Sequence, residues 1–260
     1  MSPGFSPPPA QPLGLAGIMR TALAMYRQAP VPFILVALVS TLPYEILLAG
    51  SQIAYGSARS DVRALLQDAI SLVPQLLLGQ LSIAATTVIV MQMLNGQRAH
   101  AGSALELVGE RFWQLAAVVV VTSVGIVLGF FALVIPGLYL VVLWLFAPIV
   151  SVTEDRPLKD AIERSGALVK GAFWWTLGSY LAIQVTVTLG ALVISDLVDI
   201  ALNPIGGTTG IVIRGGAAFV ALTIVAPIAN GGVALMYMDR RVRSHQEWPL
   251  PTPPGARRSS

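Results

Sequence analysis

Long uncharged stretches limit the possible folds of this chain more than any other feature. Residues 69–97, 112–153, 171–195 and 215–238 contain no Asp, Glu, Lys or Arg, in a chain of 260 residues that is 55% hydrophobic and 11% charged. An α-helix crosses the roughly 30 Å hydrocarbon core of a bilayer with about 20 residues. A membrane β-barrel would instead show segments of about 10 residues with alternating polarity. The pattern predicts an all-α, polytopic membrane helical bundle.

Six transmembrane helices are predicted, at 31–50, 69–94, 112–134, 136–153, 173–195 and 214–237. The stretch 112–153 is long enough for two of them, and Ile135-Pro136-Gly137 in its middle is the expected turn. Residues 1–12 are rich in proline, as is the segment 245–260. Such segments cannot build a core, so both are predicted to be disordered tails, which leaves 13–244 as the membrane domain.

The distribution of basic residues predicts the orientation. With both termini on one side, thirteen of the sixteen Lys and Arg residues lie on that side, and only Arg59, Arg63 and Arg214 lie on the other. Cytoplasmic loops retain basic residues, so both termini are predicted to be cytoplasmic in a multi-pass protein of the cell membrane. No basic segment leads directly into a first apolar run, so no cleavable signal peptide is expected. The strong preference for Arg over Lys is typical of GC-rich bacterial genomes.

The stretch 157–173 carries five charged residues between two uncharged runs. At 100° per residue its apolar side chains fall on one face of a helix and its charges on the other, which predicts an amphipathic helix at the inner membrane surface. Glu154, Arg164, Lys170 and Trp174 mark this interfacial elbow, with Trp174 at headgroup depth. The triplets centred on Ala22, Ala104 and Ala161 are similar. They indicate a threefold pseudo-repeat of one surface helix followed by two spans.

The segment 136–178 resembles the membrane domain named after glycerophosphoryl diester phosphodiesterases, a largely uncharacterised family of six-span bacterial proteins. The matching positions are Pro136, Gly137, Tyr139, Phe146, Pro148, Glu154, Ala161, Arg164, Ser165, Leu168, Lys170, Gly171, Trp174 and Gly178, followed near the end of the chain by Tyr237, Asp239, Arg241 and Arg243. Two positions depart from the family pattern: Trp175 stands where a basic residue is expected, and Arg240 where an apolar one is expected. The name comes from members fused to a catalytic barrel, which this sequence does not show, so the resemblance implies no activity.

The sequence offers little for catalysis. It has no cysteine, and its two histidines, His100 and His245, stand apart from each other and from carboxylate clusters. Metal-dependent hydrolysis needs several converging His, Asp and Glu side chains. We therefore expect no catalytic residue, no metal and no cofactor, and predict that the protein is not an enzyme.

Three residues inside the predicted spans are candidate polar or structural positions. Glu45 is a charge within a span, where insertion costs about 2.5–3.5 kcal/mol and a functional role is the default hypothesis. Arg214 begins the last span at a matching depth, so a Glu45–Arg214 contact is expected. Asn230 follows Pro227 in a break of the kind that builds transporter sites, although kinking and close packing explain it as well.

Taken together, these features predict a non-enzymatic integral membrane protein that acts through membrane lipids, a protein partner or a second copy of itself. No folded basic module argues for nucleic acid. The alternative is a transporter of a small solute or lipid, in which Glu45 and Asn230 would line a water-accessible path. A membrane-embedded lipid enzyme is the weakest hypothesis, because no acid–base or metal constellation supports it.

Overall fold

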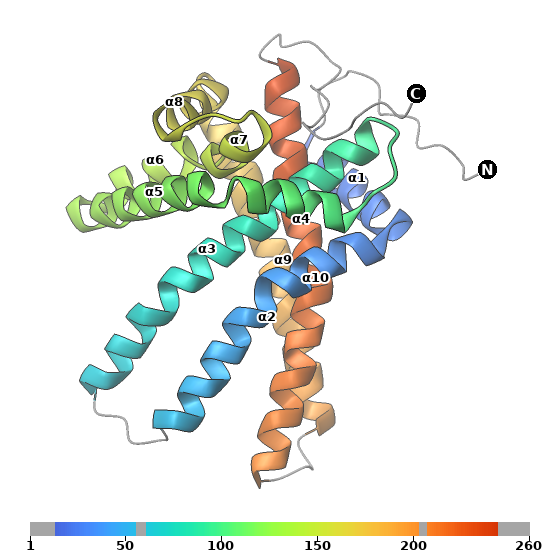
Figure 1. Ribbon diagram of the computed structural model, residues 1–260, viewed down its shortest axis with the longest axis vertical. Coiled ribbons are helices and arrows are strands. Elements are labelled where there is room, and N and C mark those ends of the chain that lie inside the picture. Colours follow the sequence, from blue (N-terminus) through green and yellow to red (C-terminus); the bar gives the residue numbers. More distant parts are fainter. Residues whose placement is uncertain (1–13, 56–60, 203–206, 244–260) are drawn as a thin grey trace.

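The structure, a computed structural model, describes residues 14–55, 61–202 and 207–243, and within them leaves out some side chains, including those of 44–45, 47–55, 61–75 and 207–215. All regular structure in these ranges is helical (Figure 1). The helices are α1 (Leu15–Gln28), α2 (Pro30–Tyr55), α3 (Asp61–Leu94), α4 (Ala101–Glu110), α5 (Phe112–Ala132), α6 (Val134–Leu143), α7 (Ala147–Thr153), α8 (Leu158–Val169), α9 (Phe173–Leu202) and α10 (Gly207–Arg243). The all-α prediction is confirmed.

Several of these helices are long and apolar enough to cross a membrane. Among the described residues they are Leu76–Leu94, Phe112–Ala132, Val134–Thr153 and Phe173–Val198. A fifth candidate joins α1 to the first part of α2, although the two meet at 96°. Helices of this length and composition are those of a membrane-embedded protein. The predicted spans 31–50 and 214–237 pass through positions whose side chains are not described, so the count of six stays a prediction.

The helices are arranged around one crowded end of the molecule. Figure 1 shows α2, α3, α9 and α10 spreading apart from this end, where α1, α4, α7 and α8 gather, while the α5–α6 pair projects to one side. We call it the basic end, defined by Arg111, Arg156, Lys159, Arg164, Lys170, Arg240 and Arg243. Helix α10 packs against α9, α3 and α1. The core of the molecule lies here, around buried side chains such as Ile18, Phe33, Ile89, Phe146 and Tyr237.

The turn between α5 and α6 lies earlier than the sequence suggests. Leu133 alone joins the two helices, in an extended conformation (φ −170°, ψ 155°). Pro136 fits within the first turn of α6 because the N–H groups there have no partner four residues earlier. Gly137 is inside α6, where a Cβ atom would lie 2.4 Å from Cγ of Phe130. The prediction of a turn at Ile135-Pro136-Gly137 was wrong, because proline and glycine here start a helix and allow close packing.

Helices α1, α4 and α8, which contain the three similar triplets, each bury one face. Ala22, Ala104 and Ala161, the central alanines of the three similar triplets, are 3%, 0% and 0% exposed. The apolar face of α8, with Leu168 and Val169, packs against protein, chiefly α7. The sequence pattern had suggested the membrane surface as its partner. An apolar face requires shelter from water, but its pattern does not distinguish lipid from protein.

Candidate functional site

Glu154 lies where the chain leaves α7 and turns toward α8. Helix α7 is buried along almost its whole length, with Ala147, Ile149, Val150 and Val152 at 0% exposure. Glu154 caps its C-terminus, and its N–H donates to the carbonyl of Val150 at 2.9 Å. The next residue, Asp155, has φ of 52°, a left-handed conformation that lets the chain reverse within one residue. The burial of α7 and this sharp turn together fix the Glu154 carboxylate at the basic end.

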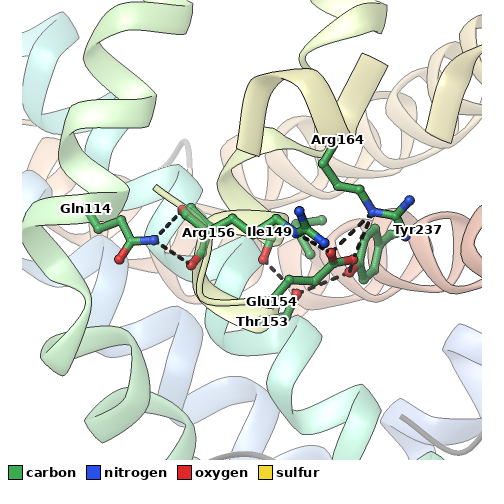
Figure 2. Close-up of polar contacts among 8 residues, drawn as sticks. Gln114, Ile149, Thr153, Glu154, Arg156, Arg164 and Tyr237 are labelled. Carbon is green, nitrogen blue, oxygen red and sulfur yellow. Dashed lines mark hydrogen bonds and ion pairs between the residues drawn. The ribbon is translucent and has the colours of Figure 1, made fainter. Parts of the chain in front are cut away.

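Three side chains from separate segments meet this carboxylate (Figure 2). Nε of Arg156, in the turn, lies 2.9 Å from Oε2, and Nε of Arg164, on α8, lies 3.2 Å from the same oxygen. The hydroxyl of Tyr237, on α10, donates to Oε1 at 2.8 Å. The Glu154 side chain is 7% exposed and that of Arg164 is 12% exposed. We call this group, Glu154 with Arg156, Arg164 and Tyr237, the Glu154 centre.

The protonation of Glu154 is set by opposing effects. Burial favours the neutral acid and so acts to raise its pKa. The hydrogen bond from Tyr237, the positive charges of Arg164 and Arg241, and the hydrogen bond from Arg156 favour the carboxylate. Together these outweigh burial and hold the pKa of Glu154 below its ordinary value. At neutral pH the group is therefore an anion sheltered among guanidinium groups.

Hydrogen bonds to the backbone hold the surrounding turn in place. The amide of Gln114, on α5, donates to the carbonyls of Ser151 and Arg156 (Figure 2). The hydroxyl of Thr153 donates to the carbonyl of Ile149 at 2.8 Å and lies 3.3 Å from that of Tyr237. Arg111 donates to the carbonyl of Val152 and lies 3.2 Å from Asp155. Arg111 and Gln114 thus attach the start of α5 to the end of α7 and the turn that follows it.

Ser165 bridges the break between α6 and α7. The chain turns at Trp144–Phe146, between α6 and α7, which leaves backbone groups without helical partners. The hydroxyl of Ser165 donates to the carbonyl of Leu143 at 2.8 Å and accepts from the N–H of Phe146 at 3.1 Å. Ser165 is completely buried. One side chain from α8 therefore satisfies both sides of the break.

The chemistry of the Glu154 centre is that of an internally neutralised ion cluster. Each carboxylate oxygen already accepts a hydrogen bond from a buried partner. Among the described residues, no three His, Asp or Glu side chains lie close enough together to hold a metal ion. Such an arrangement holds the α7–α8 turn, α8 and α10 together. The charges that a ligand could reach are those of the exposed basic residues around the centre.

The structure brings together only some of the residues singled out from the sequence. Glu154 and Arg164 meet in the centre. Lys170 follows α8 as an exposed residue, and Trp174, 79% exposed, stacks edge-on against Phe173 instead. Asn230 donates to the hydroxyl of Ser82 on α3 at 3.1 Å. The side chains of Glu45 and Arg214 lie outside the described residues, so their contact stays a prediction.

Sequence reasoning missed how several other residues act at the basic end. Tyr237 was noted only as part of the resemblance, and Arg156 only as one of the basic residues that set the orientation. Gln114 gave no signal, because its partners are backbone carbonyls 37 and 42 residues further along the chain. Trp175 also belongs here, with the guanidinium carbons of Arg240 and Arg243 lying 6.0 and 5.3 Å from the centre of its ring. Arg–Trp contacts of this kind are attractive.

Comparisons of the chain with protein-family models, with curated proteins and with solved structures found no match.

Removing the hydroxyl of Tyr237 tests one arm of the centre. Tyr237→Phe keeps the ring against Phe146, 5.9 Å away, but deletes the donor to Glu154. We expect the free energy of unfolding to fall by about 1.5 kcal/mol, the low end for a hydrogen bond to a charged group. Denaturant titration of the detergent-solubilised protein measures it. Tyr139→Phe, at a 51% exposed position, is the matched control and should change little. Equal stability of the two variants would contradict the assignment.

The Asn230–Ser82 bond predicts a smaller effect between α10 and α3. Asn230→Ala should destabilise the protein by about 1 kcal/mol, within the range for interhelical hydrogen bonds in membranes. Ser82→Ala should cost a similar amount, and the double variant no more than either single one, since one bond is lost in all three. The same titration gives all three values. Additive losses would show that the two side chains act separately.

Proposed function

We propose that this chain is a non-enzymatic integral membrane protein of the bacterial cytoplasmic membrane, and that it acts through anionic lipids and protein partners bound at its basic end. In this proposal six apolar segments lie in the membrane, both termini are cytoplasmic, and α1, α4 and α8 lie along the inner surface. Phospholipid headgroups of the inner leaflet are the first partners that such a surface meets.

The separation of charges at the basic end carries this proposal. The carboxylate of Glu154 is turned inward and neutralised, whereas Lys159, near the start of α8, is 84% exposed and Lys170, directly after the end of α8, is exposed as well. Trp113 and Trp174, at the starts of α5 and α9, are 83% and 79% exposed. Exposed cations near the membrane attract anionic headgroups, and tryptophan favours the headgroup region. The combination suits a lipid-facing rim around a rigid centre.

We also propose membership of the glycerophosphoryl diester phosphodiesterase membrane-domain family. Glu154, Arg164 and Tyr237, three of the positions that carry the resemblance, meet in one centre. The two departures from the family pattern, Trp175 and Arg240, lie in contact with each other. The family pattern has the basic residue at position 175 and the apolar one at 240, and this chain has them the other way round. The contact between one basic and one apolar side chain is thereby kept. Both observations support the proposal.

Lipid selectivity in nanodiscs tests the proposed function. The protein is placed in nanodiscs of equal phosphatidylglycerol and phosphatidylcholine, and the lipids that remain on it after release are measured by native mass spectrometry. We expect enrichment of phosphatidylglycerol. The double variant Lys159→Gln with Lys170→Gln should lose part of it, because both side chains are exposed and removable without unfolding.

The matched control changes the charge of the same helix in the opposite direction. Asp160→Asn with Glu163→Gln alters two exposed positions and should increase the enrichment. Equal lipid composition in all three proteins would overturn the lipid part of the proposal. A pull-down from native membranes, analysed for proteins and lipids together, identifies the partner. A retained solute without lipid or protein would favour transport instead, a hypothesis that the pairing of Asn230 with Ser82 does not favour.

A further inference from the structure

The α5–α6 pair differs from the other long helices in the composition of its turn. From 124 to 143 the chain contains one polar side chain, the phenol of Tyr139, and no charge. The segment between the predicted spans 31–50 and 69–94 contains Arg59, Asp61 and Arg63, and that between 173–195 and 214–237 contains Asp196 and Asp199. A turn that reaches the opposite membrane surface meets headgroups and water. The α5–α6 turn carries nothing suited to either.

The backbone at this turn is also suited to an environment without water. A helix start normally exposes several N–H groups without partners, each costly in hydrocarbon. The N–H of Leu133 donates back to the carbonyl of Gly129 at 3.0 Å, and that of Gly137 donates to the carbonyl of Leu133 at 3.3 Å. Pro136, between them, has no N–H group. Proline at position 136 and the one-residue connection thus reduce the number of backbone N–H groups that lack an acceptor at the turn.

The side chains at the turn are apolar and uncovered. Phe131 is 86% exposed, Ile135 is 81% exposed, and Leu133 and Val134 are each 69% exposed. A cluster of this kind requires hydrocarbon or another apolar surface. Its direction limits where it can lie. Figure 1 shows the hairpin, in green to yellow-green, starting from the basic end, running across the direction of α9 and α10 and diverging obliquely from α2 and α3.

Length alone does not decide between crossing and remaining inside. Helix α5 has 21 residues, so it is about 31 Å long, enough for the hydrocarbon core if it stood upright. The hairpin does not run alongside α2, α3, α9 and α10, however, so its tip does not approach the far ends of those helices (Figure 1). If they cross the bilayer, the tip stops short of the opposite surface.

We infer that the α5–α6 hairpin enters the bilayer from the basic end and does not cross it, its tip staying among the lipid acyl chains. The tip is defined by Phe131, Leu133, Val134 and Ile135. Both arms then begin and end on one side, so the placement of the two termini is unchanged and four of the six apolar segments cross. The occupant of this exposed surface is lipid hydrocarbon, because the tip has no polar side chain with which to recognise a specific protein.

The depth of three positions tests this inference. The chain has no cysteine, so single cysteines carry a spin label without background. Trp113→Cys lies at the start of α5, Val124→Cys is midway, and Ile135→Cys is at the tip. All three side chains are exposed, at 83%, 53% and 81%, so the labels should be tolerated. Collision with oxygen, which concentrates in hydrocarbon, and with a water-soluble nickel chelate gives the depth of each label in liposomes.

An embedded hairpin predicts that depth increases from Trp113 through Val124 to Ile135. A crossing hairpin predicts instead that Val124 is deepest and that Ile135 is as shallow as Trp113, which would overturn the inference. Low collision with both reagents at Ile135 would mean that protein covers the tip, and would overturn it too. Phe131→Cys repeats the tip measurement at a second position.

Labelling of intact vesicles by a membrane-impermeant maleimide gives an independent result. Gln97→Cys, exposed between α3 and α4 at the basic end, reports one side. Ser57→Cys, in the segment predicted to lie on the opposite side, reports the other. Ile135→Cys should react from neither side and should react fully after denaturation in SDS. Reaction from the side of Ser57→Cys means a crossing hairpin, and reaction from the side of Gln97→Cys means one lying on the surface. Either outcome contradicts the inference.

Discussion

Replacing Glu154 with glutamine is expected to lower the free energy of unfolding by about 3 kcal/mol, the largest effect predicted for a single residue of this protein. Glutamine has almost the same shape and still accepts a hydrogen bond from Tyr237. It cannot neutralise Arg164, whose side chain is 12% exposed, or Arg156, 2.9 Å from the carboxylate. A buried cation left without its counterion is costly, and that cost dominates the change.

Titration with denaturant in detergent measures this loss, and a double-mutant cycle with Arg164→Gln assigns it. Once the carboxylate is gone, Arg164→Gln should cost much less than it does in the wild type, because the two changes remove the same pair. The control is Glu163→Gln on the exposed face of α8, whose partner Lys159 is 3.8 Å away and 84% exposed. It should change stability by less than about 0.5 kcal/mol. Additive costs at Glu154 and Arg164 would contradict the described contact.

The same carboxylate makes stability depend on pH in one direction. The pKa of Glu154 is lower in the folded protein than in the unfolded chain, where a glutamate titrates near about 4.3. Its contribution is therefore complete above that value and is lost as the pH falls through the lower folded pKa. The difference in stability between wild type and Glu154→Gln should be constant at neutral pH and shrink below about pH 4.3. A difference that grows on acidification would contradict the sign of the shift.

Ser165→Ala is expected to give the second-largest loss, about 2 kcal/mol. The substitution removes one hydroxyl but strands two backbone groups, the carbonyl of Leu143 and the N–H of Phe146, at a fully buried position. An unsatisfied buried polar group costs about 1–3 kcal/mol, and relaxation of the break should recover part of the sum.

Thr186→Ala is the control for this prediction. Its hydroxyl is exposed on α9 and bonds only within its own helix, to the carbonyl of Ala182. Both variants are compared by denaturant titration, and hydrogen exchange at Phe146 adds a local measurement. Faster exchange of that amide in Ser165→Ala is expected because its acceptor is gone. An unchanged exchange rate with unchanged stability would show that Ser165 does not close the break.

Composition and periodicity were enough to predict the helices and their approximate ends. Apolar runs between charges locate α3, α5 and α9, and charged ends such as Asp61 or Arg243 extend helices beyond the predicted spans. The turn before α6 was misplaced because proline is favoured both in the first turn of a helix and in loops. The sequence pattern specifies local backbone preferences. Proline in a turn and proline in the first turn of a helix share those preferences and differ only in the structure around them.

The Glu154 centre was predictable only in part, for a different reason. Glu154 and Arg164 are ten residues apart on neighbouring segments, so the charge pattern groups them. Tyr237 lies 83 residues from Glu154, and no periodicity links α10 to the end of α7. Only packing shows which face of α8 meets protein and which cations remain outside. The sequence therefore predicts the interactions between neighbouring segments but not those that form when distant helices pack together.

The distance along the chain between Glu154 and Tyr237 has a consequence for synthesis in the cell. A ribosome completes α7 and α8 long before it makes the last turns of α10. While α9 and most of α10 are being made, the Glu154 carboxylate has only Arg156 and Arg164 as partners. The hydroxyl of Tyr237 and the charge of Arg241 complete its environment only after α9 and nearly all of α10 have been made. A chain that ends before Tyr237 keeps a partly satisfied charge in its middle. The contacts that α10 makes with the Glu154 centre are therefore the last interactions of that centre to form during synthesis.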